Sequence, residues 1–179
     1  MFQVDLIEKC KRNDRKAQLK LYRKYCDAMF CVANRFMKNT FDAEDVMQEA
    51  FLRAFQKLDQ YNGEVAFGAW LKRIVINKSI DKLKASKYMI SVDDIQLEVV
   101  EDDDWTVDDH ISLEEIKAAI DQLPEKYRYV TMLYLMEGYD HQEISEILNI
   151  SQTASRTQLM RGKGKLKELL KHKRNGTRH

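Results

Sequence analysis

The stretch DHQEISEILNISQTASRTQLMR, residues 140–161, says most about the fold of this chain. Asp140 and Glu143 have the spacing of a capping box that opens a short amphipathic helix. Asn149 can take the left-handed turn conformation, and Ser151 can cap the helix that follows. Two helices joined by so tight a turn predict a helix-turn-helix.

The second helix of this motif carries polar and basic side chains that suit DNA. In a helix-turn-helix the first helix braces the second, whose N-terminal turns enter the major groove. There, Arg156 can donate two hydrogen bonds to a guanine edge. The other predicted DNA-binding residues lie on or near the same side, or follow as phosphate contacts: Thr153, Thr157, Met160, Arg161, Lys163 and Lys165. An ordinary helical hairpin with a basic, solvated face is the alternative interpretation.

Charge is distributed unevenly along the chain, although the net charge of its 179 residues is only +1. Residues 1–90 carry +7 and residues 124–179 carry +5, whereas residues 91–123 carry −11. Basic surfaces gain free energy by releasing counterions from phosphates. The two basic blocks therefore favour contact with nucleic acid, and merely solvated charged faces are the alternative.

The rest of the chain has a helical pattern, with one proline and six glycines to interrupt it. Apolar residues recur at spacings of three and four over residues 16–37 and again over residues 67–83. The periodicity fails from about Ser86 to His110, and residues 88–111 are acidic and typical of a linker. We predict an all-α fold of two small helical domains, residues 1–87 and 112–179, joined by this acidic linker.

Local signals place the ends and the cores of individual helices. Asp42 is predicted to cap a helix, with Asp45 at its third position. The Asn62–Gly63 pair predicts a turn with positive φ. Leu19 belongs to the predicted apolar face of its helix, and Trp70 is expected in the core rather than stacked on a base.

No pattern in the sequence indicates an enzyme or a metal site. The three cysteines, Cys10, Cys26 and Cys31, include no CxxC pair and have no histidine at ligand spacing, so we expect reduced, buried thiols. The histidines are scattered, and no glycine-rich phosphate loop or nucleophile–base motif occurs. We therefore predict no catalytic residue, no metal and no cofactor.

The sequence also lacks the patterns of export and of membrane insertion. The N-terminus is too polar for a signal peptide. No apolar run approaches the roughly 18 residues of a membrane span. We expect a cytoplasmic protein without direct membrane insertion.

Two longer stretches resemble one protein family. DAEDVMQEAFLRAF (residues 42–55), followed by FGAWLKRIVINKSIDKLKASK (residues 67–87), resembles region 2 of extracytoplasmic-function sigma factors. LPEKYRYVTMLYLMEGYDHQEISEILNIS (residues 123–151) resembles the start of their region 4. The family orders region 2, a linker and region 4 as this chain does. The resemblance implies a factor that binds core RNA polymerase and directs promoter-specific transcription initiation through the −10 and −35 elements.

The resemblance also implies a role for each domain. In such factors the helix that opens with DAED docks on the coiled coil of the polymerase β′ subunit, here through Asp42, Glu44, Asp45, Gln48 and Glu49. The turn at residues 61–65 sits where the family captures a flipped-out −10 base. The implied −10 residues are Tyr61, Asn62, Asn77, Lys78, Asp81 and Lys82. The helix-turn-helix is expected on the −35 element.

Further partners are implied by the resemblance alone. Region 4 is expected to contact the β flap, and the acidic linker is expected to cross the active-site cleft and RNA exit path. An anti-sigma factor is a further expected partner, and in this family it is commonly anchored in the membrane. We expect the free protein to be a monomer. A stand-alone helix-turn-helix regulator is the alternative function, and an enzyme is a third.

The chain departs from the family pattern after Ile150. Arg156 replaces the usual lysine, and Gln158 stands where arginine is usual. Gly162 and Gly164 both fall within the recognition helix, each at a cost of roughly 1 kcal/mol of helix propensity. These departures bear on the preference for a −35 sequence.

Overall fold

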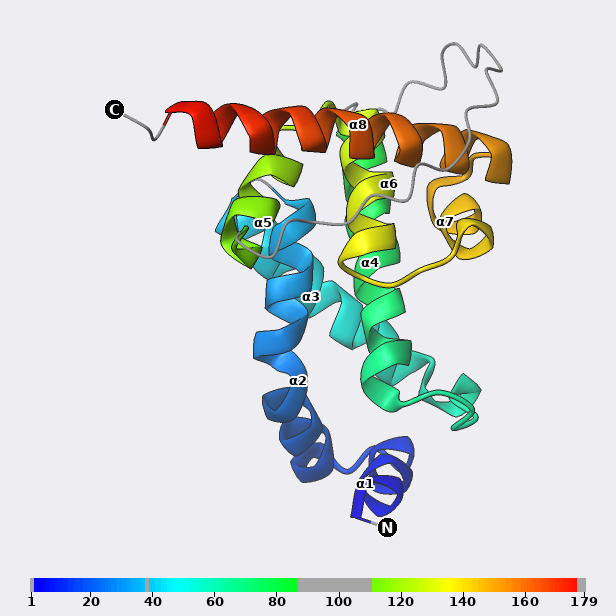
Figure 1. The fold of residues 1–179 in the computed structure, drawn as a ribbon. Helices are drawn as coiled ribbons and strands as arrows, with labels where there is room; N and C mark the ends of the chain where they lie inside the picture. The colour runs from blue at the N-terminus through cyan, green and yellow to red at the C-terminus, as the bar shows by residue number, and fades with distance from the viewer. Residues whose placement is uncertain (1, 38, 87–110, 177–179) are drawn as a thin grey trace. The chain divides into compact units, whose positions relative to one another are not determined.

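A computed structural model describes residues 2–37, 39–86 and 111–176 of the chain. Every regular element within these ranges is a helix, which confirms the predicted all-α fold (Figure 1). The chain divides into two compact units, residues 1–89 and residues 90–179. Nearly all of the predicted acidic linker lies outside the described residues, so its bounds stay predictions.

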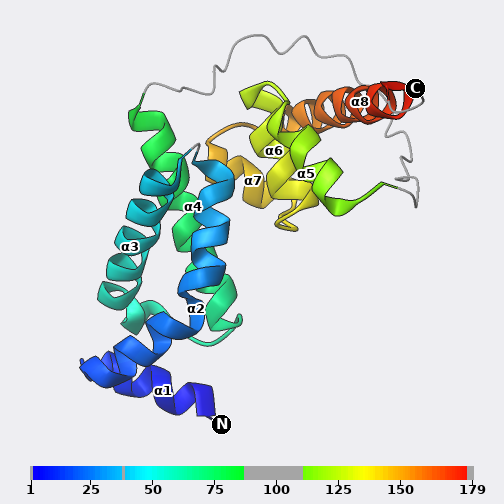
Figure 2. The same cartoon turned by 90° about the vertical axis from the view of Figure 1, so that its left-hand side faces the viewer.

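The first unit is a bundle of three long helices with a shorter helix at one end. It contains α1 (Phe2–Lys11), α2 (Arg15–Phe36), α3 (Thr40–Gln56), the 3-10 helix η1 (Leu58–Gln60) and α4 (Phe67–Ala85). Figure 2 shows α2, α3 and α4 side by side, and each of them packs on the other two. The core between them is apolar and includes Leu21, Phe36, Val46, Ala50, Leu71, Val75 and Ile76.

The buried face of α2 differs from the predicted one at Leu19. Leu19 is 48% exposed, whereas Ala17 and Leu21 are buried. Residues two apart on a helix point in nearly opposite directions, so a face that contains Ala17 and Leu21 turns Leu19 to solvent. The prediction that Leu19 is a core residue is therefore wrong.

The start of α3 also differs from the prediction, because Asn39 rather than Asp42 caps the helix. The Asn39 side-chain oxygen accepts a hydrogen bond from the Asp42 backbone N–H at 2.8 Å. The Asn39 amide nitrogen donates to the Asp42 carboxylate at 2.6 Å. Asparagine is as good a cap as aspartate, and Asn39 comes earlier in the chain. Asp42 thus lies at the third helical position, where its carboxylate can reach another helix.

The cysteines differ in burial. Cys10 is buried, and burial is the main cause that raises the pKa of its thiol. Cys26 is half-buried and Cys31 is exposed. The expectation of buried thiols is correct only for Cys10. No helix in the described ranges has the length and apolarity that a bilayer crossing requires.

The second unit consists of a long C-terminal helix and three shorter helices that pack on it. The helices are α5 (Leu113–Asp121), α6 (Glu125–Leu135), α7 (His141–Leu148) and α8 (Gln152–Gly176). Ser112 caps α5 in a capping box with Glu115. Each of α5, α6 and α7 contacts α8 (Figure 1), and the buried core includes Ile120, Tyr129, Leu133, Ile144, Leu159 and Leu166.

The two glycines of α8 have different structural roles. A Cβ added at Gly162 would collide with the Thr131 side-chain oxygen of α6. A Cβ added at Gly164 would meet no atom within 4 Å. Gly162 therefore permits the close approach of α6 and α8. Gly164 has no such packing role and only lowers the helix propensity.

Candidate functional site

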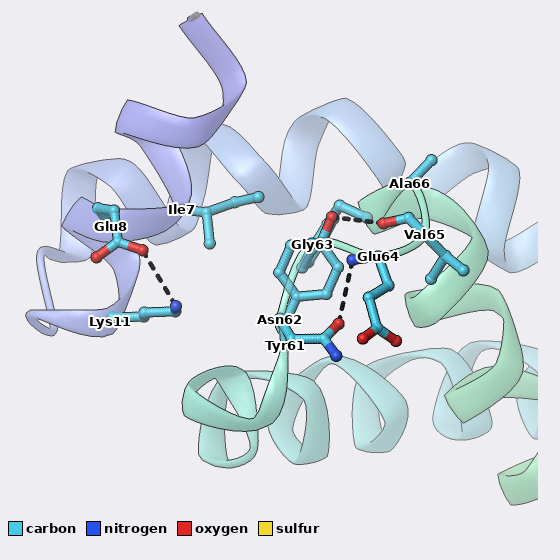
Figure 3. A pocket seen from close by; sticks show the side chains of 10 residues that line it. Ile7, Glu8, Lys11, Tyr61, Asn62, Gly63, Glu64, Val65 and Ala66 are labelled. Atoms are coloured by element: carbon cyan, nitrogen blue, oxygen red, sulfur yellow. Dashed lines mark hydrogen bonds and ion pairs between the residues drawn. The ribbon is translucent and has the colours of Figure 1, made fainter.

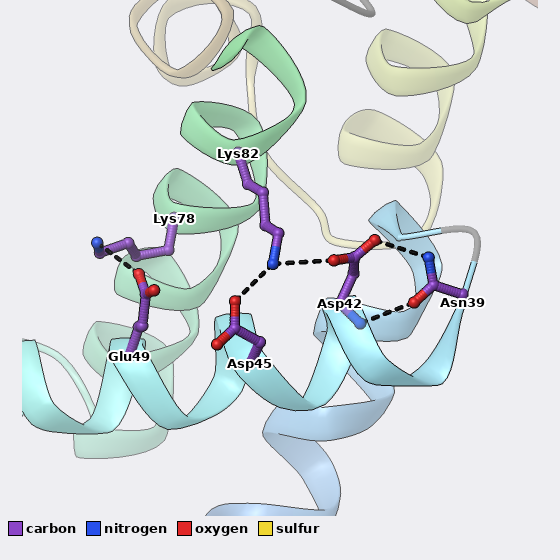
Figure 4. Close-up of polar contacts among 6 residues, drawn as sticks. All are labelled: Asn39, Asp42, Asp45, Glu49, Lys78 and Lys82. Atoms are coloured by element: carbon purple, nitrogen blue, oxygen red, sulfur yellow. Dashed lines mark hydrogen bonds and ion pairs between the residues drawn. The ribbon is translucent and has the colours of Figure 1, made fainter. Parts of the chain in front are cut away.

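The five predicted docking residues on α3 fall into two groups, the first of which faces α4. Lys82 Nζ lies 3.0 Å from Asp42 Oδ1 and 2.5 Å from Asp45 Oδ2 (Figure 4). Lys78 Nζ lies 2.9 Å from Glu49 Oε2. We call these five residues, Asp42, Asp45, Glu49, Lys78 and Lys82, the α3–α4 ion-pair cluster. It joins residues that are predicted to dock on the polymerase to residues that are predicted to bind the −10 element.

The ion pairs of this cluster lie at the surface. The lysine side chains are 26% and 33% exposed, and the carboxylates are between 45% and 55% exposed. The hydrogen bonds to Asp45 and Asp42 raise the pKa of Lys82. The hydrogen bonds from Lys82 and Asn39 lower the pKa of Asp42. Lys82 and Asp42 are therefore both charged at neutral pH, but exposed pairs of this kind contribute little to stability.

The second group of predicted docking residues lies on the outer face of α3. Glu44 and Gln48 are both exposed, and the Gln48 amide lies 3.5 Å from the Glu44 carboxylate. Phe41 and Leu52 continue the same helical face on either side of them. They are 84% and 64% exposed, which is unusual for large apolar side chains. We call Phe41, Glu44, Gln48 and Leu52 the α3 stripe.

Sequence reasoning missed the two apolar ends of this stripe. Both residues lie off the buried face that Val46, Ala50 and Ala54 define, and that mismatch was a usable signal. Leu52 lies eleven positions beyond Phe41, about 16 Å along the helix. The stripe therefore offers two apolar contacts separated by a polar, acidic centre.

The turn before α4 forms one wall of a cavity of about 500 Å³ (Figure 3). Gly63 has φ 82°, as the Asn-Gly signal predicted. Asn62 Oδ1 accepts a hydrogen bond from the Glu64 backbone at 3.1 Å, and the Tyr61 hydroxyl donates to the Val65 carbonyl at 2.7 Å. These two bonds shape the turn.

The opposite wall of this cavity comes from α1, which the sequence analysis did not identify as a helix. Its contribution consists of Ile7, Glu8 and Lys11, with the Glu8 carboxylate 3.1 Å from Lys11 Nζ (Figure 3). Charged groups thus face the turn across the cavity. A cavity of this volume lies in the range of small-molecule sites.

Aromatic rings gather beside the turn. The Tyr61 ring lies 5.5 Å from the Phe67 ring and 5.4 Å from the Trp70 ring, measured between centroids. Phe67 is buried, whereas Trp70 is only half-buried. The expectation of a core Trp70 is correct for its apolar contacts but wrong for full burial.

The remaining predicted −10 residues, Asn77 and Asp81, are exposed on α4. Asn77 lies ten residues beyond Phe67, about 15 Å along the helix from the turn. The structure therefore does not bring the six predicted −10 residues to one point. They divide between the turn and the C-terminal half of α4.

The helix-turn-helix of the second unit follows its predicted capping pattern. Glu143 N donates to the Asp140 carboxylate at 2.8 Å, and Asp140 N donates to the Glu143 carboxylate at 3.0 Å. Asn149 has φ 57° and ψ 50°, a left-handed conformation. The Ser151 hydroxyl accepts a hydrogen bond from Ala154 N at 3.0 Å and so caps α8.

The predicted −35 residues on α8 differ in their solvent exposure and in their side-chain contacts. Thr153, Arg156 and Lys165 are exposed, and within residues 111–176 no carboxylate forms an ion pair with Arg156 or Lys165. Thr157 is half-buried and its hydroxyl donates to the Thr153 carbonyl at 3.0 Å. Met160 is half-buried.

Arg161 and Lys163 instead contact aromatic residues of α6. Burial would raise the pKa of Tyr127, but a hydrogen bond from Arg161 and the nearby Lys126 charge lower it overall. Lys163 Nζ lies 5.6 Å from the centre of the Tyr134 ring. Both basic residues therefore help to pack α8 on α6.

His141, at the start of α7, also contacts α8. A ring nitrogen of His141 lies 2.8 Å from the hydroxyl of the fully buried Ser155. The His141 ring also stacks on the Tyr134 ring at 5.1 Å. His141 links α6, α7 and α8, a contact that no local pattern reveals.

Comparison with known families gives matches to both units. The model of "Sigma-70 region 2" matches residues 21–88, and that of "Sigma-70, region 4" matches residues 113–166. The chain is 31% identical over 177 residues to the "ECF RNA polymerase sigma factor SigW" of Bacillus subtilis, covering 92% of this chain and 95% of that protein. It is 31% identical over 170 residues to the "RNA polymerase sigma-H factor" of Pseudomonas aeruginosa, covering 88% of each.

Two solved structures share the fold. One is CnrH in complex with the cytosolic domain of CnrY, with a TM-score of 0.54 and 22% identity over 93% of this chain and 96% of that one. The other is the sigma factor RpoE in complex with the anti-sigma factor NepR from Bartonella quintana. Its TM-score is 0.56, with 19% identity over 85% of this chain and 95% of that one.

Proposed function

Because this chain belongs to the extracytoplasmic-function family of RNA polymerase sigma factors, we propose how its two units divide the work of promoter recognition. The first unit docks on core polymerase through α3 and holds the −10 element with α4 and the turn before it. The second unit reads the −35 element with α8. The observation that carries this proposal is the α3 stripe, an exposed surface that a DNA-binding role does not explain.

The α3 stripe suits a helical, basic partner such as the coiled coil of polymerase β′. Phe41 and Leu52 provide apolar anchors at its two ends, and buried aromatic and apolar anchors dominate the energy of many interfaces. Glu44 and Gln48 lie between them and can accept hydrogen bonds from basic side chains. Asp45 and Glu49 follow these two residues in sequence and extend the acidic surface toward α4.

The cavity beside the turn suits one unstacked −10 base. The two hydrogen bonds within the turn hold Asn62 and Tyr61 in place before a base arrives. A base that leaves its stack needs new stacking and hydrogen bonds, which the half-buried Tyr61 ring and the polar cavity wall can supply. Asn77 can read a further base edge, while Lys78 and Lys82 suit backbone phosphates and Asp81 lies on the same exposed part of α4.

The exposed part of α8 suits the major groove of the −35 element. Arg156 is one turn beyond the exposed Thr153, so both reach the same groove, with Thr157 and Met160 beside them. Lys165 suits a phosphate. Arg161 and Lys163 combine a contact to α6 with a position from which their charges attract DNA. Contact of this unit with the β flap is part of the proposal.

An anti-sigma factor is the further partner that we propose. Support comes from the RpoE structure, in which a sigma factor of the same fold is bound to one. Such a partner would compete with core polymerase for part of the surface described above. A pull-down with core polymerase, with and without an anti-sigma candidate, measures that competition.

Run-off transcription with core polymerase, this protein and genomic fragments tests the proposed function. We expect promoter-specific transcripts that depend on this protein. We also expect weak binding of the free protein to duplex DNA, because each basic surface is small. Tight, sequence-specific binding by the free protein without transcription would instead indicate a stand-alone regulator.

A further inference from the structure

In the α3–α4 ion-pair cluster, acids of α3 contact lysines of α4, and the two sets of side chains have different proposed partners. Lys82 donates to Asp45 and lies 3.0 Å from Asp42, while Lys78 donates to Glu49 at 2.9 Å. The lysines are proposed to hold DNA phosphates, and the acids belong to the helix proposed to dock on polymerase. An ammonium group bound to carboxylates has fewer donors left for a phosphate.

The charge of the cluster also opposes DNA in the free protein. Three carboxylates face two ammonium groups, so the cluster carries a net charge of −1. A phosphate that approaches Lys78 or Lys82 therefore meets Asp45 and Glu49 as well. Withdrawing the charges of these two acids would change the net charge of the cluster from −1 to +1.

We infer that Asp45 and Glu49 occupy, in the free protein, the positions that DNA phosphates take on Lys82 and Lys78, and that docking on core polymerase withdraws them. This inference rests on the proposed docking of α3. Basic side chains of the docked partner pair with Asp45 and Glu49, and the two lysines become available to DNA. Polymerase binding thus creates the phosphate site in the C-terminal half of α4.

The geometry of the pairs permits such an exchange. All of these side chains are at least a quarter exposed, so the pairs can separate without opening the core of the bundle. Asp45 directly follows Glu44 and Glu49 directly follows Gln48, so both acids border the α3 stripe. A partner seated on the stripe lies within reach of their carboxylates.

Asp42 differs from the other two acids and is expected to stay in place. The Asn39 amide holds its carboxylate at 2.6 Å, and its position near the start of α3 favours a negative charge. It then remains a positioning residue for Lys82. The exchange therefore concerns the two acids that lie farther along the helix.

The test uses the full-length chain with the double substitution Asp45→Asn and Glu49→Gln. Both changes keep the side-chain shape and remove the charge. Binding to a fluorescent oligothymidylate reports phosphate contacts without sequence preference, and binding to core polymerase is measured in parallel. We expect oligothymidylate affinity to rise about 3–10-fold, with a salt dependence steeper by about 1.4 for two added phosphate contacts.

Glu44→Gln is the matched control, because Glu44 is an exposed acid on the same helix and its carboxylate contacts the Gln48 amide rather than a lysine. We expect Glu44→Gln to weaken core binding and leave oligothymidylate binding unchanged. The double variant should weaken core binding and strengthen oligothymidylate binding. Adding Lys78→Gln and Lys82→Gln to the double variant should abolish the gain.

Three results would overturn the inference. Unchanged oligothymidylate affinity in the double variant would show that the acids do not mask the lysines. A gain that survives the loss of both lysines would assign it to another surface. A gain without weaker core binding would show that polymerase does not compete for these acids. If Glu44→Gln also leaves core binding unchanged, the docking face itself is wrong, which separates failure of the proposed function from failure of the exchange.

Discussion

The two units present their charged residues in different ways. In the first unit Lys78 and Lys82 of α4 are bound by acids of α3, so this part of the proposed DNA surface is neutralised within the unit. In the second unit Arg156 and Lys165 are exposed on α8, and no acid of the described residues is seen paired with them. The second unit can therefore meet DNA as it stands, whereas the first unit needs a partner that removes the acids.

This difference suits an assembly that should engage promoters only on the polymerase. A first unit with masked lysines adds little to the DNA affinity of the free chain. A second unit with few free basic residues binds weakly by itself, because affinity for DNA grows with the number of phosphates neutralised.

The largest expected effect comes from the helix contact that supports α8. Gly162→Ala should destabilise the second unit by about 1–3 kcal/mol, because the added methyl group collides with Thr131 in a buried contact. Gly164→Ala should stabilise it by up to about 1 kcal/mol, because that position is open and alanine favours the helix. Thermal unfolding of both variants measures the two signs. Equal effects of the two substitutions would contradict the close approach of α6 and α8.

Arg156→Ala tests whether the exposed arginine reads a base. A bidentate contact to guanine carries about 1–3 kcal/mol of discrimination, so we expect relaxed preference at one or two −35 base pairs. Lys165→Ala should instead weaken all promoters evenly and reduce the salt dependence. Transcription from a library of −35 variants distinguishes the two. An equal loss at every promoter in Arg156→Ala would make Arg156 a phosphate contact.

Phe41→Ala tests whether the docking surface of the first unit includes an apolar anchor. We expect core polymerase affinity to fall about 5–10-fold, which corresponds to about 1 kcal/mol. Leu19→Ala is a suitable control, because Leu19 is also an exposed apolar residue but lies on α2. Unfolding temperatures should hardly change in either variant. A similar loss of affinity in the control would indicate a general surface effect.

The smallest expected effect is the acid sensitivity of the ion-pair cluster. Hydrogen bonds from Lys82 and Asn39 lower the pKa of Asp42 in the folded protein. At a pH above its unfolded-state pKa, Asp42 therefore makes its full contribution to the free energy of unfolding. This contribution is lost as the pH falls through the folded-state pKa. Urea unfolding at decreasing pH should show this loss of stability, and the loss should be smaller in Asp42→Asn. The same pH dependence in parent and variant would exclude a role for this pairing.

The amino-acid sequence by itself determined the features that depend on neighbours within a few residues. The Asp140–Glu143 capping box, the left-handed Asn149 and the turn at Gly63 all formed as predicted. Each depends on contacts across three or four positions, and residue type and spacing carry that information directly. The same local reasoning was wrong for the cap of α3 because two good capping residues, Asn39 and Asp42, lie three positions apart.

Only the tertiary structure decided which side chains face one another across helices. Lys78 and Glu49 are 29 positions apart in sequence, and Lys82 and Asp45 are 37 apart. The fit of Gly162 against Thr131 likewise joins two helices. Such contacts depend on how the packed cores rotate and space the helices, and a single sequence does not express those rotations. For this reason the sequence identified the acids and lysines as candidates for two separate partners, while the folded chain brought them together.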